Sequence, residues 1–244
     1  MTADDIHANP ALTLVVPLLD EEGNVEAVAE DLLYAFRTAD IPLTLLLVDN
    51  GSKDGTRAKV QALEAKHDDV RGLYLDKNAG YGGGIQAGMA EADTPLLGWM
   101  WGDAQIEAGD VVRVYRRLLT DKADLSKARR VQRVDGWQRS VVTRVYNLAT
   151  LWLFHVPSVD TNGCPKIFTR AAWEELAPKS TDWFLDPEVM IGYGRKGMKL
   201  AEVDVLAKPR TKGVSKVGTG TVAEFVVNLL RARAKVNKGE ADLR

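Results

Sequence analysis

The chain has 244 residues, a formal net charge of −2 and 45% hydrophobic residues, which is ordinary for a soluble globular protein with one large domain. The balanced charge argues against nucleic acid as the main partner. The single cysteine, Cys164, excludes an internal disulfide and favours a reducing compartment. Residues 1–10 do not resemble a signal peptide, and the apolar run at residues 148–156 has about half of the ~20 residues needed to span a bilayer.

Four short apolar runs are each followed by a polar loop and then by residues at helical spacing. The runs are residues 12–16, 43–48, 72–75 and 96–101. Successive strand–loop–helix units predict parallel strands with right-handed crossovers, and therefore a doubly wound, mainly parallel α/β sheet with helices on both faces. Because the carboxyl ends of parallel strands share one edge, we expect the four polar loops to converge on one crevice of the kind that binds nucleotides.

The fourth run ends in Gly102, Asp103, Ala104 and Gln105. A carboxylate that a buried strand delivers to the sheet edge is held rigidly, and it suits a hard cation such as Mg²⁺ or Mn²⁺, which takes oxygen ligands and bridges phosphates. The alternative is that Asp103 caps the next helix, because aspartate is a favoured N-cap. This stretch alone favours neither interpretation.

The glycines at residues 80–84 resemble a phosphate cradle but lack the lysine and the serine or threonine of a P-loop, which favours a flexible turn. The loop after the first strand lacks G-x-G-x-x-G, so a dinucleotide cofactor is unsupported. We interpret Cys164 as a small loop residue rather than a nucleophile, since no pattern pairs it with a histidine.

After residue 110 the alternation of strands and helices becomes less regular. The pattern predicts helices at residues 111–119, 141–154 and 171–176, and strands at residues 123–128, 167–168 and 199–206. Asp186 is placed to cap a further helix, with Pro187 at its first position.

Three basic stretches have two interpretations each. The arginine-rich residues 129–133 are expected on a solvated face, with an anion-binding loop as the alternative. Four cations between residues 208 and 216 favour the neutralisation of a diphosphate over a soluble tail. The apolar helical stripe at residues 222–230, which has a basic flank, favours packing on its own domain over contact with a membrane surface.

Seven stretches match the pattern of a known family when they are taken together. The most specific is V-D-N-G-S-K-D-G-T at residues 48–56, which is close to V-D-D-G-S-x-D-G-T. The others are V-V-P-L-L-D-E-E (15–22), N-A-G-Y-G (78–82), W-G-D-A-Q-I (101–106), D-T-N-G-C-P-K-I-F (160–168), K-L-A-E-V-D-V (199–205) and R-T-K-G-V-S-K (210–216). The chain therefore resembles glycosyltransferase family 2, the inverting GT-A fold, and within it the dolichyl- and polyprenyl-phosphate sugar synthases.

The resemblance implies a division of the chain and a role for each matched residue. A GT-A domain would span residues 1–217, with a nucleotide-binding half at about 11–106 and an acceptor half at about 107–217, and residues 218–244 would form an amphipathic helix and basic tail. The nucleotide-binding residues would be Pro17, Glu21, Asp49, Gly80, Gly102, Asp103, Arg210 and Lys216. Within this set, Pro17, Glu21 and Asp49 would hold the base and ribose. Arg210 and Lys216 would bind the phosphates.

Asp103 and Gln105 would bind a divalent cation, Mg²⁺ or Mn²⁺, on the diphosphate, and Asp103, Asp186 and Arg210 would be the catalytic residues. Two positions depart from the family pattern. Trp101 replaces the first aspartate of D-x-D, which removes one expected metal or ribose contact, and Asn50 replaces the second aspartate of V-D-D.

The resemblance implies an inverting transfer of a sugar from GDP-mannose or a UDP-sugar to a polyprenyl phosphate, in the cytoplasm or at the inner membrane surface with peripheral membrane association. A phosphate acceptor is already a nucleophile, whereas a hydroxyl needs a base, for which Asp186 is the candidate. The first alternative is transfer to a hydroxyl of a soluble small molecule, peptide or polysaccharide. The second is a nucleotide-binding protein or nucleotidyltransferase, and the third is a non-catalytic relative, for which Trp101 is the hint.

Overall fold

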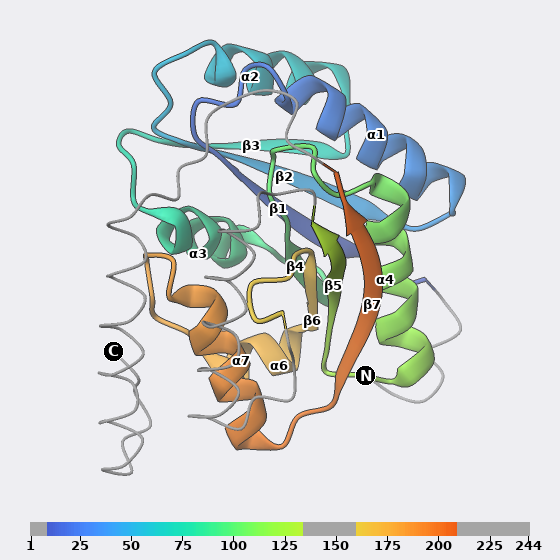
Figure 1. The fold of residues 1–244 in the computed structure, drawn as a ribbon. Helices are drawn as coiled ribbons and strands as arrows, with labels where there is room; N and C mark the ends of the chain where they lie inside the picture. The colour runs from blue at the N-terminus through green and yellow to red at the C-terminus, as the bar shows by residue number, and fades with distance from the viewer. Residues whose placement is uncertain (1–8, 134–159, 209–244) are drawn as a thin grey trace.

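The computed structural model describes residues 9–133 and 160–208, which form one layered α/β unit (Figure 1). Its strands belong to one sheet, in the order β3-β2-β1-β4-β6-β5-β7. The strands are β1 (Leu12–Leu18), β2 (Leu43–Asn50), β3 (Val70–Leu75), β4 (Leu96–Trp99), β5 (Leu125–Arg133), β6 (Lys166–Thr169) and β7 (Leu200–Ala207). The helices are α1 (Val25–Thr38), α2 (Thr56–Lys66), α3 (Tyr81–Glu91), α4 (Ala108–Asp121), α6 (Arg170–Leu176) and α7 (Leu185–Lys196).

The first four strands are parallel, as the alternating pattern predicts. β1 pairs with β2 on one side and with β4 on the other, and β3 pairs with β2. β6 runs antiparallel to both of its neighbours, whereas β5 and β7 are parallel to each other. The sheet is therefore mainly parallel with one reversed strand, and the exits of β1 to β4 lie on one edge.

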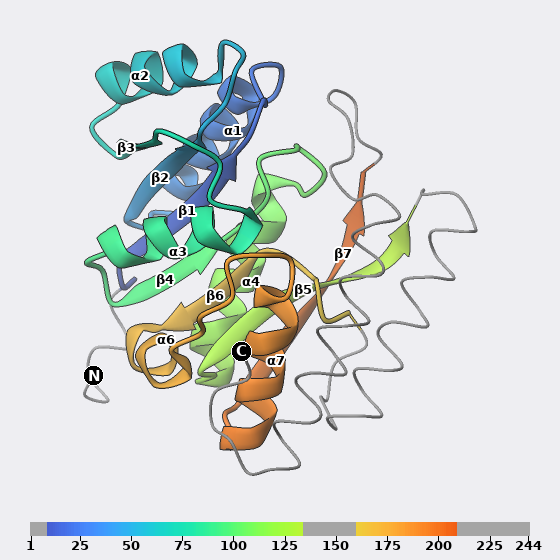
Figure 2. The ribbon, with the colours of Figure 1, turned by 90° about the vertical axis from the view of Figure 1, so that its left-hand side faces the viewer.

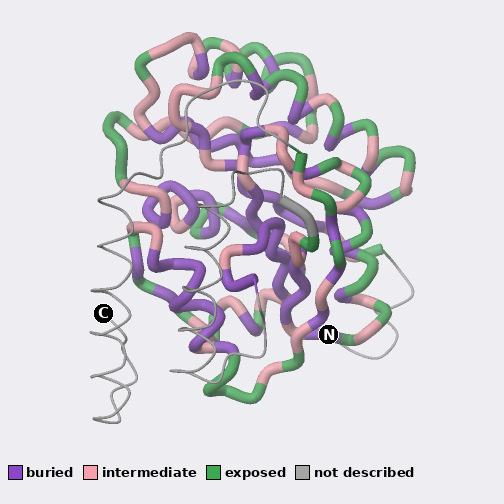
Figure 3. The backbone as a smooth tube through the Cα atoms, in the orientation of Figure 1, coloured by how far each residue is buried: buried purple, intermediate pink, exposed green. Residues whose placement is uncertain are grey.

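Two hydrophobic cores lie on opposite faces of this sheet, because its buried strands are apolar on both sides. In β1, Leu14 and Val16 belong to the core under α1 and α4, whereas Val15 belongs to the core under α3 and α7. Figure 2 shows α3 and α7 on the opposite side of the sheet from α4, and Figure 3 shows that the central strands are buried along their length. In the ranges that the structure describes, no helix has the length and apolar content to cross a bilayer.

Pro17 lies near the end of the central strand β1, where a residue without an N–H group is normally excluded. The carbonyl of Val15 accepts the N–H of Met100 at 3.0 Å, so this side of β1 faces β4. β4 ends at Trp99, which lies opposite Val15. Pro17 lies two residues further along β1, where β4 no longer offers a hydrogen-bond partner. The chain leaves the sheet here, between the two strands where the strand order reverses, which is where such sheets bind ligands.

Several boundaries differ from those expected from the sequence. α4 begins at Ala108 with Glu107 as its N-cap, so Asp103 is not a helix cap. The expectation that Asp186 caps a helix is wrong, because α7 begins at Leu185 with Phe184 at the N-cap position. β5 includes the arginine-rich stretch, so the alternative of an anion-binding loop is wrong. The expected solvated face fits the partly exposed Arg129 but not the buried Arg130. The predicted helix at 141–154 and the stripe at 222–230 lie outside the described residues.

We predict that Gly88→Ala lowers the free energy of unfolding by about 1–3 kcal/mol, although alanine favours helix more than glycine does. Gly88 packs α3 so closely on the sheet that a Cβ atom would lie 2.5 Å from Cγ1 of Val15 and 3.0 Å from Cγ2 of Val48. Both neighbours are β-branched and stiff. Gly109→Ala is the matched control in α4, where a Cβ atom would meet nothing within 4 Å. Urea denaturation measures both, and equal stabilities would contradict the close packing.

Candidate active site

The carboxylate of Asp49 lies at the carboxyl edge of the sheet, because Asp49 is the penultimate residue of β2. It is fully buried, and both of its oxygens accept hydrogen bonds. Oδ1 accepts the N–H of Ser52 at 3.0 Å, and Oδ2 accepts Nε of Arg57 at 2.6 Å. Arg57 also donates to the carbonyl of Leu75 at 2.7 Å. Asp49 is thus fixed in orientation by the loop and helix that follow it.

The loop after β1 is bonded to the loop after β2. Asp20 has a φ of 53°, a left-handed conformation that turns its carboxylate to accept the N–H of Lys53 at 2.8 Å. The N–H of Glu21 donates to Oγ1 of Thr56 at 2.9 Å. The side chain of Glu21 accepts Nδ2 of Asn24 at 2.7 Å. The structure therefore brings Glu21 and Asp49, two of the predicted nucleotide contacts, into adjoining loops.

Asn50 connects β2 to the third loop. Its Nδ2 donates to the carbonyl of Gly80 at 2.9 Å, and its Oδ1 accepts the N–H of Ala79 at 2.9 Å. Gly80 has a φ of 86°, and a Cβ atom there would lie 2.4 Å from the carbonyl oxygen of Thr181, so only glycine fits. The asparagine that departs from the family pattern therefore has a role that an aspartate cannot fill, because it donates a hydrogen bond.

The glycine-rich residues after Gly80 form the first turn of α3 rather than an open cradle. The N–H of Gly83 donates to the carbonyl of Thr181 at 2.9 Å, and the side chain of Gln86 donates to the carbonyl of Ser180 at 2.9 Å. The segment before α7 thus packs across this helix terminus. Residues 81–84 therefore form a packed helical turn, and the expectation of a flexible turn there is wrong.

Asp103 lies beside the end of β1 and is only 4% exposed. Its Oδ1 accepts the N–H of Gln105 at 3.2 Å, and the residue between them, Ala104, has a φ of 57°. Gly102 is pressed against β1, since a Cβ atom there would lie 2.5 Å from Cδ2 of Leu18. In the described part of the chain, no group of three or more histidine, cysteine, aspartate or glutamate side chains gathers to hold a metal ion.

The indole of Trp101 starts a chain of buried polar contacts. Its Nε1 donates to the hydroxyl of Tyr81 at 2.9 Å, and this hydroxyl donates to Oδ2 of Asp186 at 3.0 Å. Asp186 is 1% exposed, and its other oxygen forms an ion pair with the buried Lys166. Burial and the adjacent Asp186 carboxylate raise the pKa of Tyr81 well above its ordinary value, so the hydroxyl remains a donor.

A second buried ion pair lies under the same tryptophan. The guanidinium of Arg130 lies 4.9 Å from the centre of the Trp101 ring and contacts both oxygens of Asp160, at 2.9 and 2.6 Å. Burial opposes ionisation of Asp160, but Arg130 outweighs it and holds the pKa of this carboxyl well below its usual range. Lys127 donates to the Asp160 carbonyl at 2.8 Å and pairs with Glu202 at 2.9 Å.

The sequence did not single out Tyr81, Lys127 or Lys166 as parts of a network. The only sequence signal for the two lysines was that they lie in or beside strand-like runs. Charged residues in such runs usually lie on an exposed face, so the signal did not indicate a buried network. Cys164 lies close to this network and is fully buried, and its burial raises the pKa of its thiol to about 12. This fits the interpretation of Cys164 as a structural residue, because a nucleophilic cysteine needs a thiolate.

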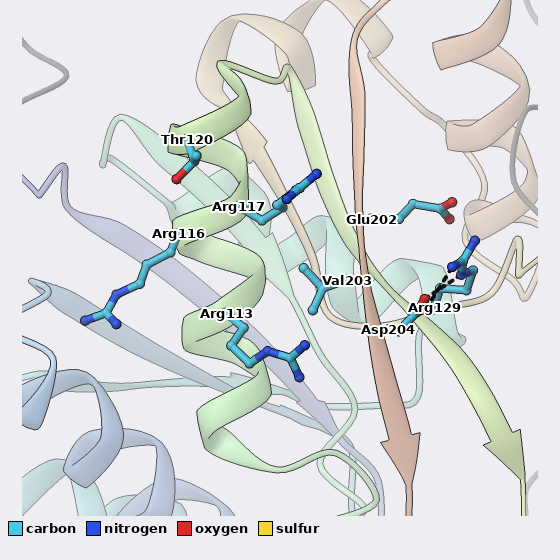
Figure 4. Close-up of a pocket in the computed structure, with 8 residues that line it drawn as sticks. All are labelled: Arg113, Arg116, Arg117, Thr120, Arg129, Glu202, Val203 and Asp204. Carbon is cyan, nitrogen blue, oxygen red and sulfur yellow. Dashed lines mark hydrogen bonds and ion pairs between the residues drawn. The ribbon is translucent and has the colours of Figure 1, made fainter.

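Another concavity, of about 460 Å³, is lined by none of these loop residues (Figure 4). It lies between α4 and β7, the last strand of the sheet, and is lined by Arg113, Arg116, Arg117, Thr120, Arg129, Glu202, Val203 and Asp204. Its arginines have acidic partners: Arg113 pairs with Asp110, Arg117 with Asp121 and Arg129 with Asp204. Arg116 points away from β7 (Figure 4). Three of the concavity's four arginines are therefore already paired with acidic side chains, and the loops at the strand exits remain the better candidate site.

The structure brings most of the predicted site residues to one edge of the sheet. Six of them lie at the exits of β1, β2 and β4 or at the start of α3: Pro17, Glu21, Asp49, Gly80, Gly102 and Asp103. Arg210 and Lys216 lie outside the described residues. Lys208, the last described residue, is hydrogen-bonded to Gln105, so β7 ends beside the Asp103 loop.

Comparison with known proteins gives the class of this fold. The crystal structure of glucosyl-3-phosphoglycerate synthase from Mycobacterium tuberculosis, in complex with Mn²⁺, UDP and glucosyl-3-phosphoglycerate, matches with a TM-score of 0.73. The two sequences are 18% identical, and the match covers 93% of this chain and 81% of that one. The fold is therefore the GT-A fold of glycosyltransferases, as expected.

The family follows from the sequence comparisons. The model of glycosyl transferase family 2 matches residues 1–173, so the chain belongs to this family and is a glycosyltransferase. An uncharacterized glycosyltransferase of Mycobacterium tuberculosis is 29% identical, over 91% of this chain and 96% of that protein. A dodecaprenyl-phosphate galacturonate synthase of Rhizobium johnstonii is 26% identical, over 90% of this chain but only 65% of that protein. Family membership sets aside the nucleotidyltransferase alternative.

We predict that Asn50→Asp, which restores the family's second aspartate, lowers the free energy of unfolding by about 1–3 kcal/mol. The carboxylate would face the carbonyl oxygen of Gly80 and Oδ1 of Asn78, both of which Nδ2 of Asn50 now contacts as a donor. Lys53→Gln, at an exposed position of the neighbouring loop, is the control. Thermal and urea unfolding measure both variants. An Asn50→Asp protein as stable as the control would show that the donated hydrogen bonds are unimportant.

Proposed function

We propose that the protein transfers a sugar from a nucleotide-diphospho-sugar to a polyprenyl phosphate, with inversion at the anomeric carbon. The donor would occupy the crevice between the ends of β1 and β4. Glu21 and Asp49 would contact the nucleoside there, and Asp103 would face the diphosphate. The convergence of these side chains on the switch point of the sheet supports this placement. The UDP in the structural neighbour supports it as well.

The described residues supply enough oxygen ligands for a divalent cation only when the diphosphate of the donor adds its own oxygens. Trp101 supplies no oxygen ligand, and its indole N–H is already bonded to Tyr81. Asp103 remains as the carboxylate of this stretch. Mg²⁺ and related cations are commonly held by one or two carboxylates together with substrate phosphates, so one buried carboxylate is enough when the diphosphate is bound. A bound cation would neutralise the charge that develops on the departing diphosphate.

The chain's own residues would perform the remaining tasks of the transfer. The interlocked loops of Asp20 and Lys53 hold Asp49 in one orientation before the donor arrives, which lowers the cost of ordering the complex. The sheet edge and the packed Gly102 turn hold Asp103 in the same way. Arg210 and Lys216, which lie outside the described residues, are proposed to bind the phosphates.

The observation that carries the choice of acceptor is the state of Asp186. This residue is the candidate base for a hydroxyl acceptor, but it is buried, accepts a hydrogen bond from Tyr81 and is paired with Lys166. A carboxylate with both oxygens engaged is poorly placed to take a proton from a substrate. A phosphate monoester needs no base, because its second pKa is about 6 and it is a dianion at neutral pH. The geometry therefore favours a phosphate acceptor.

The comparison with the dodecaprenyl-phosphate galacturonate synthase agrees with this choice of acceptor. A polyprenyl acceptor is carried by a lipid bilayer, so we place the reaction at the cytoplasmic surface of a membrane, with the protein bound peripherally. The alternative acceptor is the hydroxyl of a soluble molecule, which is favoured by the fold similarity to a glucosyl-3-phosphoglycerate synthase.

Incubation with radiolabelled UDP- and GDP-sugars and either polyprenyl phosphate in detergent or soluble hydroxyl acceptors tests the acceptor class. We expect the labelled sugar in the lipid fraction. Mild acid should release it, because a sugar linked to a phosphate is acid-labile. Release of nucleoside diphosphate accompanies it in equal amount. An acid-stable, water-soluble glycoside as the sole product would overturn the proposal.

We predict that loss of Asp186 reduces kcat less than about 10-fold, whereas removal of a general base typically costs about 10²–10⁴-fold. Asp186→Asn alone leaves Lys166 buried without its charged partner, which destabilises proteins by about 3–5 kcal/mol. The double variant Lys166→Met, Asp186→Asn removes both charges and keeps the fold testable. A folded double variant that loses more than 100-fold in kcat, and whose pH–rate profile loses the acid limb that a general base produces, would identify Asp186 as the base.

We further predict that Mn²⁺ binds this protein weakly by itself and tightly together with UDP or GDP, because one buried carboxylate has to share the ion with phosphate oxygens. Thermal stabilisation measures this, since a ligand that binds only the native state raises the melting temperature. Asp103→Asn should remove the effect of Mn²⁺ on nucleotide binding. Asp110→Asn, in the first turn of α4 where the carboxylate is paired with Arg113, is the control. Equal responses of the two variants would exclude Asp103 as the metal ligand.

A further inference from the structure

Gln105 has more contacts than its predicted role as a metal ligand requires. Its backbone N–H donates to Oδ1 of Asp103 at 3.2 Å. Its backbone carbonyl accepts the N–H of Lys208 at 2.8 Å, and its side-chain Nε2 donates to the carbonyl of Lys208 at 3.0 Å. Gln105 is thus hydrogen-bonded both to the candidate metal ligand Asp103 and to the N–H and the carbonyl of Lys208.

The local backbone explains how Gln105 reaches both partners. Ala104 is left-handed, with a φ of 57°, and this reverses the chain just after Asp103. β7 ends at Ala207, so Lys208 is the first residue beyond the sheet. The contact therefore joins the exit of β4 to the exit of β7, although β6 and β5 separate these two strands in the sheet.

A neighbouring contact makes the same connection with a different kind of bond. Nζ of Lys208 pairs with Glu107 at 2.9 Å, but both side chains are more than half exposed. Exposed ion pairs contribute little, about 0–1 kcal/mol. Gln105 makes two directional hydrogen bonds to the backbone of Lys208, so we assign the connection to Gln105 rather than to Glu107.

We propose that Gln105 is a positioning residue that joins the end of β7, at Lys208, to the loop that carries Asp103. The Asp103 loop is then held in place at the sheet edge before the donor binds. This inference rests on the proposed function, because it assigns a purpose to the connection in that reaction.

The positioning role and the metal-ligand role use different atoms of the same side chain. The bond to Lys208 uses the Nε2 donor, whereas a cation would take the Oε1 oxygen. Gln105→Glu separates them, because glutamate keeps an oxygen ligand but has no donor for the Lys208 carbonyl. Gln105→Ala removes both groups. Glu107→Gln removes only the exposed ion pair and is the matched control.

Amide hydrogen exchange measured by NMR without any ligand tests the connection directly. The amides of Gln105 and Lys208 both donate to partners within this turn, so their exchange reports its opening. We expect exchange at both to become about 3- to 10-fold faster in Gln105→Glu and in Gln105→Ala, as loss of one net hydrogen bond implies. Glu107→Gln should exchange like the wild type. Unchanged exchange in both Gln105 variants would overturn the proposal.

Donor kinetics then test the purpose of the connection. A positioning residue for the donor should raise the KM for the nucleotide sugar by about 3- to 10-fold in both Gln105 variants, with a smaller change in kcat. A defect in Gln105→Ala that Gln105→Glu fully restores would show a metal ligand and no positioning role. If the wild type binds no nucleotide sugar, the proposed function fails, whereas the exchange measurement still decides whether Gln105 holds Lys208.

Discussion

The early end of β4 beside β1 is the constraint on which the site depends. β1 continues to Leu18, but β4 ends at Trp99, so the last residues of β1 have no strand on that side. Pro17 is tolerated there because it has no N–H to leave unpaired. Gly102 crosses the gap at a distance that no side chain permits, and Asp103 follows at the open edge. The shortness of one strand thus determines where the Asp103 carboxylate lies.

The two halves of the site are stabilised by different physical means. In the proposed donor half, loops are joined by hydrogen bonds between side chains and backbone, such as those of Asp20 and Asn50. These fix loop shape, and the buried Asp49 carboxylate is paired with the partly exposed Arg57. In the proposed acceptor half, one buried ion pair joins Arg130 of β5 to Asp160, and another joins Lys166 of β6 to Asp186 of α7. Breaking one such pair leaves an uncompensated buried charge, so this half should resist rearrangement more strongly.

Much of the donor half could be predicted from the sequence, because its signals are local. An apolar run followed by Asp49 or Asp103 needs only the rule that parallel strands end on one edge. The acceptor half could not be predicted in the same way. Arg130 sits in an arginine-rich stretch that is typical of a solvated surface, and only the pairing of β5 with distant segments reveals its burial against Asp160. α7 begins at Leu185, two residues before the expected Pro187, because the first turn of a helix tolerates both an aspartate and a proline, whose missing N–H would have no partner there.

Trp101 links these two halves and gives a reason for its departure from D-x-D. An aspartate at this position would add negative charge beside Asp103 and could not donate to Tyr81. It would also leave Arg130 without the ring that it covers. The tryptophan instead joins the exit of β4 to the Tyr81–Asp186–Lys166 chain through a neutral hydrogen bond to the Tyr81 hydroxyl. The same network that fills the place of the missing carboxylate also engages Asp186, so the change at Trp101 is consistent with the proposal of an acceptor that needs no base.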